Sequence, residues 1–169
     1  MDEDQLVAAA IEELNLIMQF FPRVDSKLAF VFALDLGMLA LLAANAPKLD
    51  PNSPSQFFAL VPVLVLGASL WYVYRGSYPN TVGGHQSLIY FREIALRTES
   101  GFAREFSSQS RGAYVSALLE QIHRNSAILA RKYDAAKAAF VLTGVAVIPW
   151  LISLLLFVTH SADLRLHTS

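Results

Sequence analysis

Three apolar segments, each close to the length that crosses a lipid bilayer, most strongly limit what this chain can fold into. They cover residues 28–46, 57–74 and 138–158. A helix needs about 20 apolar residues to cross a hydrocarbon layer roughly 30 Å thick. The alternative is a soluble bundle with three buried helices, but a chain of 169 residues has little other sequence to cover segments that are apolar on every face. We therefore predict an all-α membrane protein with three transmembrane helices.

The composition supports this prediction and narrows the function classes. Apolar residues make up 54% of the chain and charged residues 16%, whereas soluble domains average about 25% charged residues. The net charge of −1 argues against a partner that is a nucleic acid polymer, because such binders carry a basic surface. The chain has no cysteine, which excludes disulfides, thiolate metal sites and cysteine nucleophiles.

The distribution of lysine and arginine predicts the orientation. Residues 1–27 and 75–137 share one side of the membrane and carry eleven of these residues, whereas residues 47–56 and 159–169 share the other side and carry two. Positively charged loops stay in the cytoplasm. We expect a cytoplasmic N-terminal helix (1–27), a transmembrane hairpin (28–74), a cytoplasmic module (75–137), a third span (138–158) and an external tail (159–169).

Residues 2–21 carry apolar side chains three and four apart, which predicts an amphipathic helix. The stripe consists of Val7, Ala10, Leu14, Ile17 and Phe21. Pro22 is expected to break or kink the chain before the first span. The polar face is acidic, whereas helices that lie in the membrane interface are rich in lysine and arginine. Packing on a partner helix is therefore favoured over an interfacial anchor.

A partner for this helix precedes the third span. Residues 113–136 contain neither Gly nor Pro and repeat the spacing of three and four, in the stripe Val115, Leu118, Ile122, Leu129 and Ala136. Neither Gly nor Pro stops this helix before the third span, so we predict one long helix over residues 113–158, roughly 65–70 Å long. Its first part is a cytoplasmic stalk, which becomes the third span. Residues 1–27 carry a net charge of −4 and residues 75–137 one of +4, which favours their pairing.

The stretch between the second span and the stalk is the least regular. Gly and Pro residues between 76 and 84 indicate a loop. A short helix is expected from Ser87 to about Thr98, and Gly101 is expected to interrupt it. Five aromatic residues of this stretch are predicted to form a small core with the two longer helices: Tyr78, Tyr90, Phe91, Phe102 and Phe106.

Asp35 is the one acidic residue inside a predicted span. It lies seven residues from the cytoplasmic end of its span, and Ser69 and Thr143 lie five residues into theirs, so the three are expected to form a polar layer. Acidic residues within membranes indicate function, here an inter-helix lock, a subunit contact or a pore-lining group. The alternative is a protonated Asp35 that is hydrogen-bonded within one bundle.

No catalytic motif occurs in the chain, so we expect neither an enzyme nor a metal site. The cytoplasmic arginines are the other candidates for chemistry, because a guanidinium binds phosphate and an aromatic ring stacks on a flat base. Arg124 and Arg131 flank the stalk stripe. The alternative is attraction to the anionic inner leaflet. The candidate ligand-binding residues are Arg92, Arg97, Arg131, Tyr90 and Tyr133.

The layout and several short motifs resemble the transmembrane effectors of Pycsar antiphage systems. The likeness covers roughly residues 20–160, with two spans, a cytoplasmic insert and a last span that continues a long helix. Its motifs are Asp25-Ser26-Lys27-Leu28-Ala29, then Leu88-Ile89-Tyr90-Phe91 with Ile94-Ala95, and on the stalk Gln121-Ile122, Ile128 and Arg131-Lys132-Tyr133.

The resemblance implies a signalling ligand, cyclic UMP or cyclic CMP, that the protein binds in the cytoplasm. It implies that the protein then impairs the bacterial inner membrane and stops the infected cell. A homo-oligomer is expected, because one three-helix protomer is too thin to enclose a pore and one face carries small residues, namely Ala29, Ala33 and Gly37. Two rivals stay open: an effector of a cyclic oligonucleotide, and a ligand-independent scaffold or channel subunit.

The orientation yields the first testable prediction. A reporter that is active only in the cytoplasm should be inactive when fused after Ser169 and active when fused before Met1, because eleven of thirteen basic residues hold the other segments inside. The two fusions serve as controls for each other. An active fusion at Ser169 would contradict the predicted topology.

Overall fold

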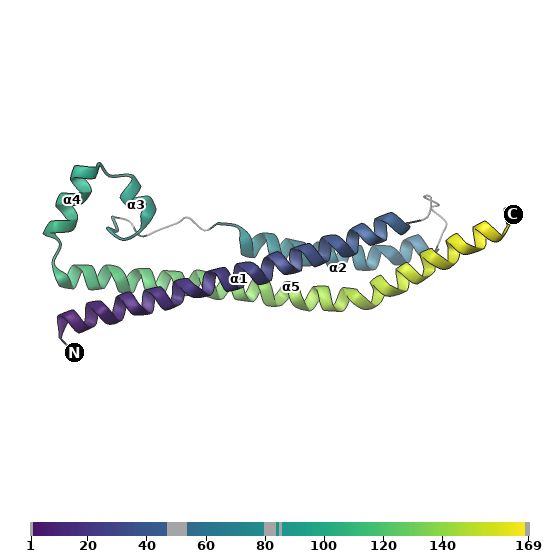
Figure 1. Ribbon diagram of the computed structural model, residues 1–169, viewed down its shortest axis with the longest axis horizontal. Helices are drawn as coiled ribbons and strands as arrows, with labels where there is room; N and C mark the ends of the chain where they lie inside the picture. The colour runs from purple at the N-terminus through teal and green to yellow at the C-terminus, as the bar shows by residue number, and fades with distance from the viewer. Residues whose placement is uncertain (1, 47–53, 80–83, 85, 168–169) are drawn as a thin grey trace. The chain divides into compact units, whose positions relative to one another are not determined.

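The computed structural model describes residues 2–46, 54–79, 84 and 86–167, and the side chains of these residues except 54–56 and 160–167. All regular structure in this part of the chain is helical (Figure 1). The helices are α1 (Glu3–Asn45), α2 (Pro54–Ser77), α3 (Phe91–Ala95), α4 (Glu99–Ser108) and α5 (Arg111–His167). Three of them, α1, α2 and α5, are long and apolar enough to cross a membrane, which confirms the prediction of an all-helical chain with three helices that could span a bilayer.

The chain forms two compact units. Unit 1 consists of Met1–Val24 and Tyr78–Lys132, and unit 2 consists of Asp25–Ser77 and Tyr133–Ser169. Unit 1 therefore holds the first part of α1, both short helices and the first part of α5. Unit 2 holds the rest of α1, all of α2 and the rest of α5.

Helix α1 passes through Pro22, so the break predicted there is wrong. The positions of α1 that are buried or half-buried follow spacings of four and three along the helix: Ala10, Leu14, Ile17, Phe21, Val24, Leu28, Val31, Asp35, Met38 and Leu42. Pro22 is exposed and lies outside this stripe. Its ring and its missing N–H, which normally destabilise a helix interior, therefore leave the packed face of α1 unaltered.

Helix α5 contains the whole range 113–158 that the sequence predicts as one helix, and it continues to His167, into the range expected to be a tail. One stripe of its buried and half-buried positions keeps the spacing of three and four: Val115, Leu118, Ile122, Asn125, Leu129, Lys132, Ala136, Ala139, Thr143, Ala146, Trp150, Ser153 and Phe157. This seven-residue repeat is the pattern of helices that pack side by side along their length.

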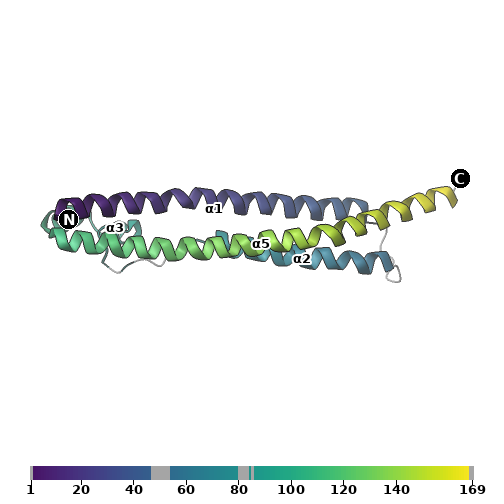
Figure 2. The ribbon, with the colours of Figure 1, turned by 90° about the horizontal axis from the view of Figure 1, so that it is seen from below.

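Helices α1 and α5 run parallel to each other within each unit (Figure 2). In unit 1, Arg111 forms an ion pair with Asp4 at 2.7 Å, and the Asn125 side-chain amide donates to the Met18 sulfur at 3.3 Å. The exposed ion pair contributes little to stability, so the pairing of the two helices is stabilised mainly by their apolar stripes. In unit 2, the same two helices meet at Met38 and Ala146.

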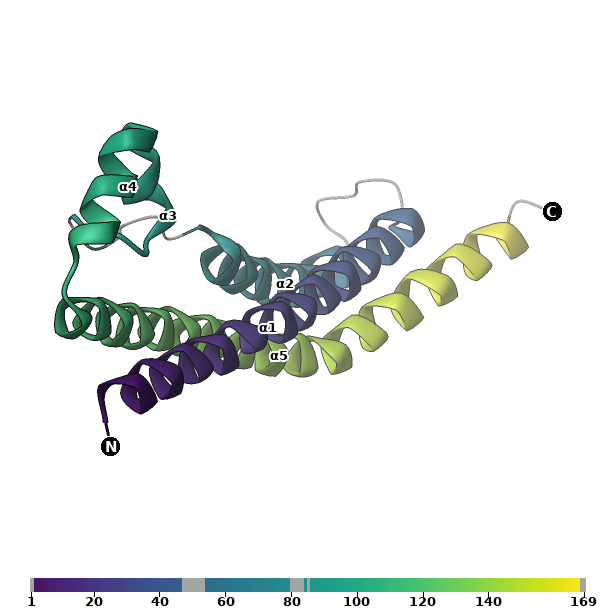
Figure 3. The same cartoon turned by 60° about the vertical axis from the view of Figure 1, so that its left-hand side comes forward.

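Helix α2 completes the core of unit 2 (Figure 3). Leu66 is fully buried and packs with Met38 of α1 and Ala146 of α5. The Trp150 indole N–H donates to the Met38 carbonyl oxygen at 2.9 Å. At the other end of α2, a Cβ on Gly76 would lie 3.0 Å from the Cβ of Ala135. Gly76 therefore lies in a close helix contact and not in the loop that its residue type suggests.

The short helices differ from the sequence prediction. The helix expected over residues 87–98 is only α3, five residues long. Gly101 does not interrupt a helix but lies in the first turn of α4, where its N–H donates to the side chain of Thr98. The Thr98 hydroxyl caps the new helix, and such a cap is typical of a helix N-terminus.

The predicted aromatic core of unit 1 is largely wrong. Tyr90 is buried, but Phe91, Tyr78 and Phe106 are 68%, 63% and 46% exposed. Phe106 pairs with Phe102 along α4, with ring centroids 5.6 Å apart, and with Tyr114 of α5 at 6.0 Å. Because α3 has only five residues, it lacks the length to bury these rings against the long helices. They remain on the surface of unit 1.

Candidate functional site

The segment between α2 and α4 is held by side-chain hydrogen bonds to its backbone. The Ser87 hydroxyl accepts the backbone N–H groups of Ile89 at 3.2 Å and Tyr90 at 3.1 Å. Gln86 has a φ of 61°, which costs a residue other than glycine about 1–3 kcal/mol. Its N–H donates to Glu93 Oε2 at 2.9 Å. These bonds determine the path of the chain around Arg97.

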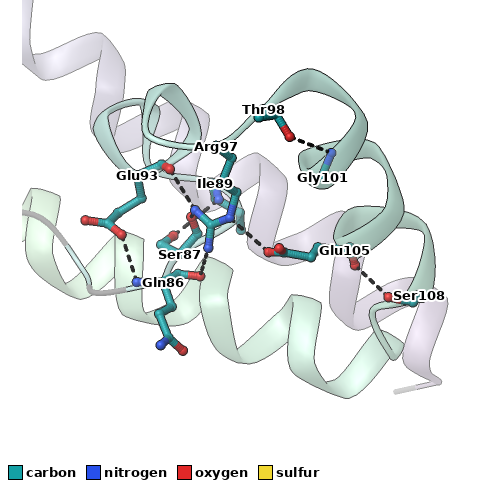
Figure 4. Close-up of polar contacts among 9 residues, drawn as sticks. All are labelled: Gln86, Ser87, Ile89, Glu93, Arg97, Thr98, Gly101, Glu105 and Ser108. Carbon is teal, nitrogen blue, oxygen red and sulfur yellow. Dashed lines mark hydrogen bonds and ion pairs between the residues drawn. The ribbon is translucent and has the colours of Figure 1, made fainter.

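Arg97 connects this segment to α4 (Figure 4). Its Nη1 donates to the carbonyl oxygen of Glu93 at 2.7 Å and to that of Ser87 at 3.4 Å. Its Nη2 donates to the carbonyl oxygen of Gln86 at 3.0 Å, and its Nε donates to Glu105 Oε2 at 2.9 Å. The Arg97 side chain is only 15% exposed. Such a buried cation needs partners of this kind, so Arg97 organises this part of unit 1.

A pocket of about 530 Å³ opens beside Arg97. Small-molecule sites usually have volumes between about 300 and 1,000 Å³. Its walls offer one guanidinium, two carboxyl groups, one amide and two leucine side chains, from Gln86, Leu88, Glu93, Leu96, Arg97 and Glu105. The pocket is therefore large enough for a small ligand with one anionic group.

A second arginine–aromatic pair lies on the α5 side of unit 1. The Arg124 guanidinium carbon lies 5.8 Å from the centroid of the Tyr90 ring, and its Nη2 donates to Glu120 Oε1 at 2.8 Å. Gly84 is buried against this pair, and a Cβ there would lie 2.8 Å from Arg124 Nη2. The sequence places Arg124 beside the stalk stripe. Only the fold brings Tyr90, from another element, onto it.

The five predicted ligand-binding residues do not form one cluster. Tyr90 and Arg97 both bond to Ser87, whereas Arg92 and Arg131 are exposed residues of unit 1 that do not line the pocket. Tyr133 belongs to unit 2, where the Lys27 ammonium lies 5.2 Å from its ring centroid. Arg97 is the arginine of this set that borders the pocket.

In unit 2, the three polar residues of the spans are in contact. The Thr143 Oγ1 lies 2.8 Å from Asp35 Oδ1 and 3.1 Å from Ser69 Oγ. All three side chains are buried, with exposures of 4%, 0% and 0%. They link α1, α2 and α5 at one level of the bundle. Their role in assembly or conduction stays a prediction.

Asp35 depends on Thr143 for its hydrogen bonding. Its Oδ2 has no hydrogen-bond partner among the described residues, and its Oδ1 meets only the Thr143 hydroxyl. That hydroxyl and Ser69 Oγ also lie within 3.0 Å and 3.2 Å of the Ala139 carbonyl oxygen. A buried acid without hydrogen-bond partners is costly in a bilayer. The Thr143 hydroxyl is therefore the main group that stabilises Asp35 in this polar layer.

The small residues Ala29, Ala33 and Gly37 are exposed on α1. A Cβ added to Gly37 would meet no atom within 4 Å. This face is therefore open to lipid or to a second protomer, and the predicted oligomer stays untested.

The histidine residues are not gathered into a site in the part of the chain that the structure describes. His85 and the side chains of His160 and His167 lie outside it. Within the described ranges, no three metal-ligating side chains form a group.

Comparison with known proteins identifies the family. A family model described as the Pycsar effector protein domain matches residues 9–159. A search of curated proteins and a search of solved structures find no match. The matched range includes most of both units, the Arg97 cluster and the intramembrane polar layer.

The polar layer yields the second testable prediction. Thr143→Val removes the hydroxyl that contacts Asp35 and Ser69, so it should destabilise the bundle by about 1–2 kcal/mol. The measurement is the midpoint of unfolding by SDS in mixed micelles, followed by the fluorescence of Trp150 in a Trp71→Phe background, because the chain has two tryptophans. Thr159→Val is the matched control, because that hydroxyl is exposed and bonds only within α5. Equal midpoints for the two variants would contradict the assigned contacts.

Proposed function

The chain belongs to the Pycsar effector family, whose model covers residues 9–159, and from this premise we propose what it senses and what it does. It is a membrane effector of antiphage defence. We propose that it binds a cyclic pyrimidine mononucleotide, cyclic UMP or cyclic CMP, in the cytoplasm. On binding, it impairs the integrity of the bacterial inner membrane, and growth of the infected cell stops.

Unit 1 has the chemistry that such a ligand requires. A cyclic mononucleotide carries one phosphate charge and one flat base. Arg97 supplies a guanidinium at a pocket of about 530 Å³, and guanidinium–phosphate pairs are among the strong hydrogen-bonded contacts. Tyr90 lies close by, but its ring is buried beneath Arg124. The exposed ring of Phe91, 4.9 Å from that of Tyr90, is better placed to stack on a base.

Unit 2 has the properties of the membrane part. Its helices carry large exposed apolar residues such as Phe30, Leu64, Ile148 and Leu155, which suit contact with lipid tails. Trp71 and Tyr74 are exposed at one end of α2 with ring centroids 5.8 Å apart, and such aromatic residues favour the membrane–water interface.

The proposed coupling between sensing and damage rests on the long helices. Helix α5 begins in the proposed sensing unit and continues through the membrane unit as one helix. A ligand that prefers one packing of its first part shifts the population of conformations of the whole helix. Several protomers are proposed to act together in the bilayer, with no nucleic acid polymer as partner.

Ligand binding is the third testable prediction. Calorimetry on the detergent-solubilised protein should detect cyclic UMP or cyclic CMP. Alanine at Arg92, Arg97 and Arg131 together should weaken binding by about 10–150-fold, the effect of losing a charge-assisted contact. Arg97→Ala alone should account for most of this loss, because Arg97 borders the pocket.

Arg104→Ala is the matched control, because Arg104 is an exposed arginine of α4 outside the pocket. It should bind like the wild type. Binding of a cyclic dinucleotide in place of the mononucleotides would favour the effector of a cyclic oligonucleotide. If no nucleotide binds, the protein is a ligand-independent scaffold or channel subunit. Unchanged binding by the triple variant would remove these arginines from the site.

The effect on the membrane is the fourth prediction. In cells that produce the cyclic nucleotide, the wild type should depolarise the membrane, as reported by a potential-sensitive dye. Insertion of Gly-Gly-Ser after Lys132 should abolish this effect and keep ligand binding. It weakens the helix by roughly 1 kcal/mol per Gly and rotates its two parts by about 300°. Asp35→Leu should still insert but alter the depolarisation.

The control is the same insertion between Asn45 and Pro54, outside α1 and α2, which should leave depolarisation intact. Depolarisation at the wild-type level by the Lys132 insertion would remove α5 from the coupling mechanism. Depolarisation at that level by Asp35→Leu would leave Asp35 with a structural role only.

A further inference from the structure

The hydrogen bonds of Arg97 leave one edge of its guanidinium incompletely used. A guanidinium has five N–H donors, and four of those of Arg97 have partners: two on Nη1, one on Nη2 and one on Nε. The second N–H of Nη2 has no partner among the described residues. Nε and Nη2 together form the side-on edge that can bind two oxygens at once, whereas Glu105 Oε2 accepts from Nε alone.

The occupant of this edge is the carboxylate of Glu105. One oxygen, Oε2, accepts from Nε at 2.9 Å, and the Glu105 side chain is 50% exposed. The three other contacts of Arg97 are backbone carbonyl oxygens of Gln86, Ser87 and Glu93. The guanidinium is therefore anchored firmly from one side by its own segment. From the other side it is held by a single, half-exposed acid, and such a pair contributes little.

A phosphate can form more hydrogen bonds with this edge than Glu105 does. Two phosphate oxygens can accept from Nε and Nη2 in parallel, which adds one charge-assisted hydrogen bond. The three carbonyl contacts can stay in place, so the guanidinium is already oriented. The pocket that Arg97 and Glu105 both line has room for the rest of a mononucleotide.

We propose that the Glu105 carboxylate occupies the phosphate position in the ligand-free protein, and that a nucleotide phosphate displaces it from Arg97. This inference deepens the proposed function and rests on it. Two anions cannot share one guanidinium edge without repulsion, so the bound phosphate expels Glu105. Glu93 remains in place, because its Oε2 accepts the N–H of Gln86.

Displacement of Glu105 would release α4. Glu105 is the residue of α4 whose side chain bonds to Arg97, and α4 ends at Ser108, three residues before α5 begins at Arg111. Release therefore acts directly on the start of the long helix. The ring of Phe106, next to Glu105 in α4, packs edge-on against Tyr114 of α5, so movement of α4 also changes a contact with α5.

The test compares Glu105→Gln with the matched control Glu99→Gln, which makes the same charge change at an exposed position of α4. Calorimetry with cyclic UMP and with cyclic CMP should give about twofold to fivefold tighter binding for Glu105→Gln, the worth of a half-exposed ion pair. Glu99→Gln should bind like the wild type. Without nucleotide, amide hydrogen exchange in α4 should be faster in Glu105→Gln than in Glu99→Gln.

The outcomes separate this inference from the function on which it rests. If the wild type binds nucleotide and Glu105→Gln binds it no tighter than Glu99→Gln, the competition between Glu105 and phosphate is wrong while the proposed function stands. If exchange in α4 is equal in the two variants, Glu105 does not hold α4. If the wild type binds neither cyclic nucleotide, the proposed function fails and this inference fails with it.

Discussion

The packing of α1 against α5 is the interaction on which both units depend. In unit 1 the contacts join Asp4 to Arg111 and Met18 to Asn125, and in unit 2 Asp35 meets Thr143. The partners differ in residue number by 107 or 108, so the two parallel helices keep the same register in both units. A sustained seven-residue repeat produces such a register. Everything else is attached to this pair: α2 in unit 2, and the α3–α4 segment in unit 1.

With unit 1 outside the bilayer and unit 2 within it, as proposed, the driving force for this packing differs between the two units. Outside a bilayer, burial of residues such as Ile17 and Leu118 removes apolar surface from water. Within lipid that gain vanishes, because the acyl chains are as apolar as the side chains, and close packing with polar contacts replaces it. Close packing in lipid is favoured by small residues such as Ala139 and Ala146 on α5. The polar contacts come from the hydroxyls of Ser69 and Thr143. The stripe of α1 thus changes from plain hydrophobes to one that includes Asp35.

Arg97 has a comparable place in the α3–α4 segment, where regular structure is scarce. Three carbonyl oxygens and one carboxylate converge on it, so it supplies the order that a longer helix would provide. The partners of this buried cation come from the segment before α4 and from α4 itself. An anion that alters one of these contacts therefore alters the order of both elements, which suits a sensor. Under the proposed function, stability of this segment and recognition of a phosphate depend on the same guanidinium.

The sequence by itself determined the long elements and the chemistry of the interior. Runs of apolar residues predicted the three membrane helices, the spacing of three and four predicted the packed faces of α1 and α5, and equal depth predicted that Asp35, Ser69 and Thr143 lie at one level. These features are local or periodic, so they can be found without knowing the fold.

Only the tertiary structure decided the features that depend on which groups meet. Pro22 is tolerated because it lies off the packed stripe. Helix α3 begins only at Phe91, although the Ser87 hydroxyl accepts the N–H groups of Ile89 and Tyr90. The sequence placed Arg97 and Arg124 among several arginines, but their partners at Glu105 and Tyr90 come from other elements. Such contacts between separate elements carry no periodic signal, because they arise when these elements fold against one another.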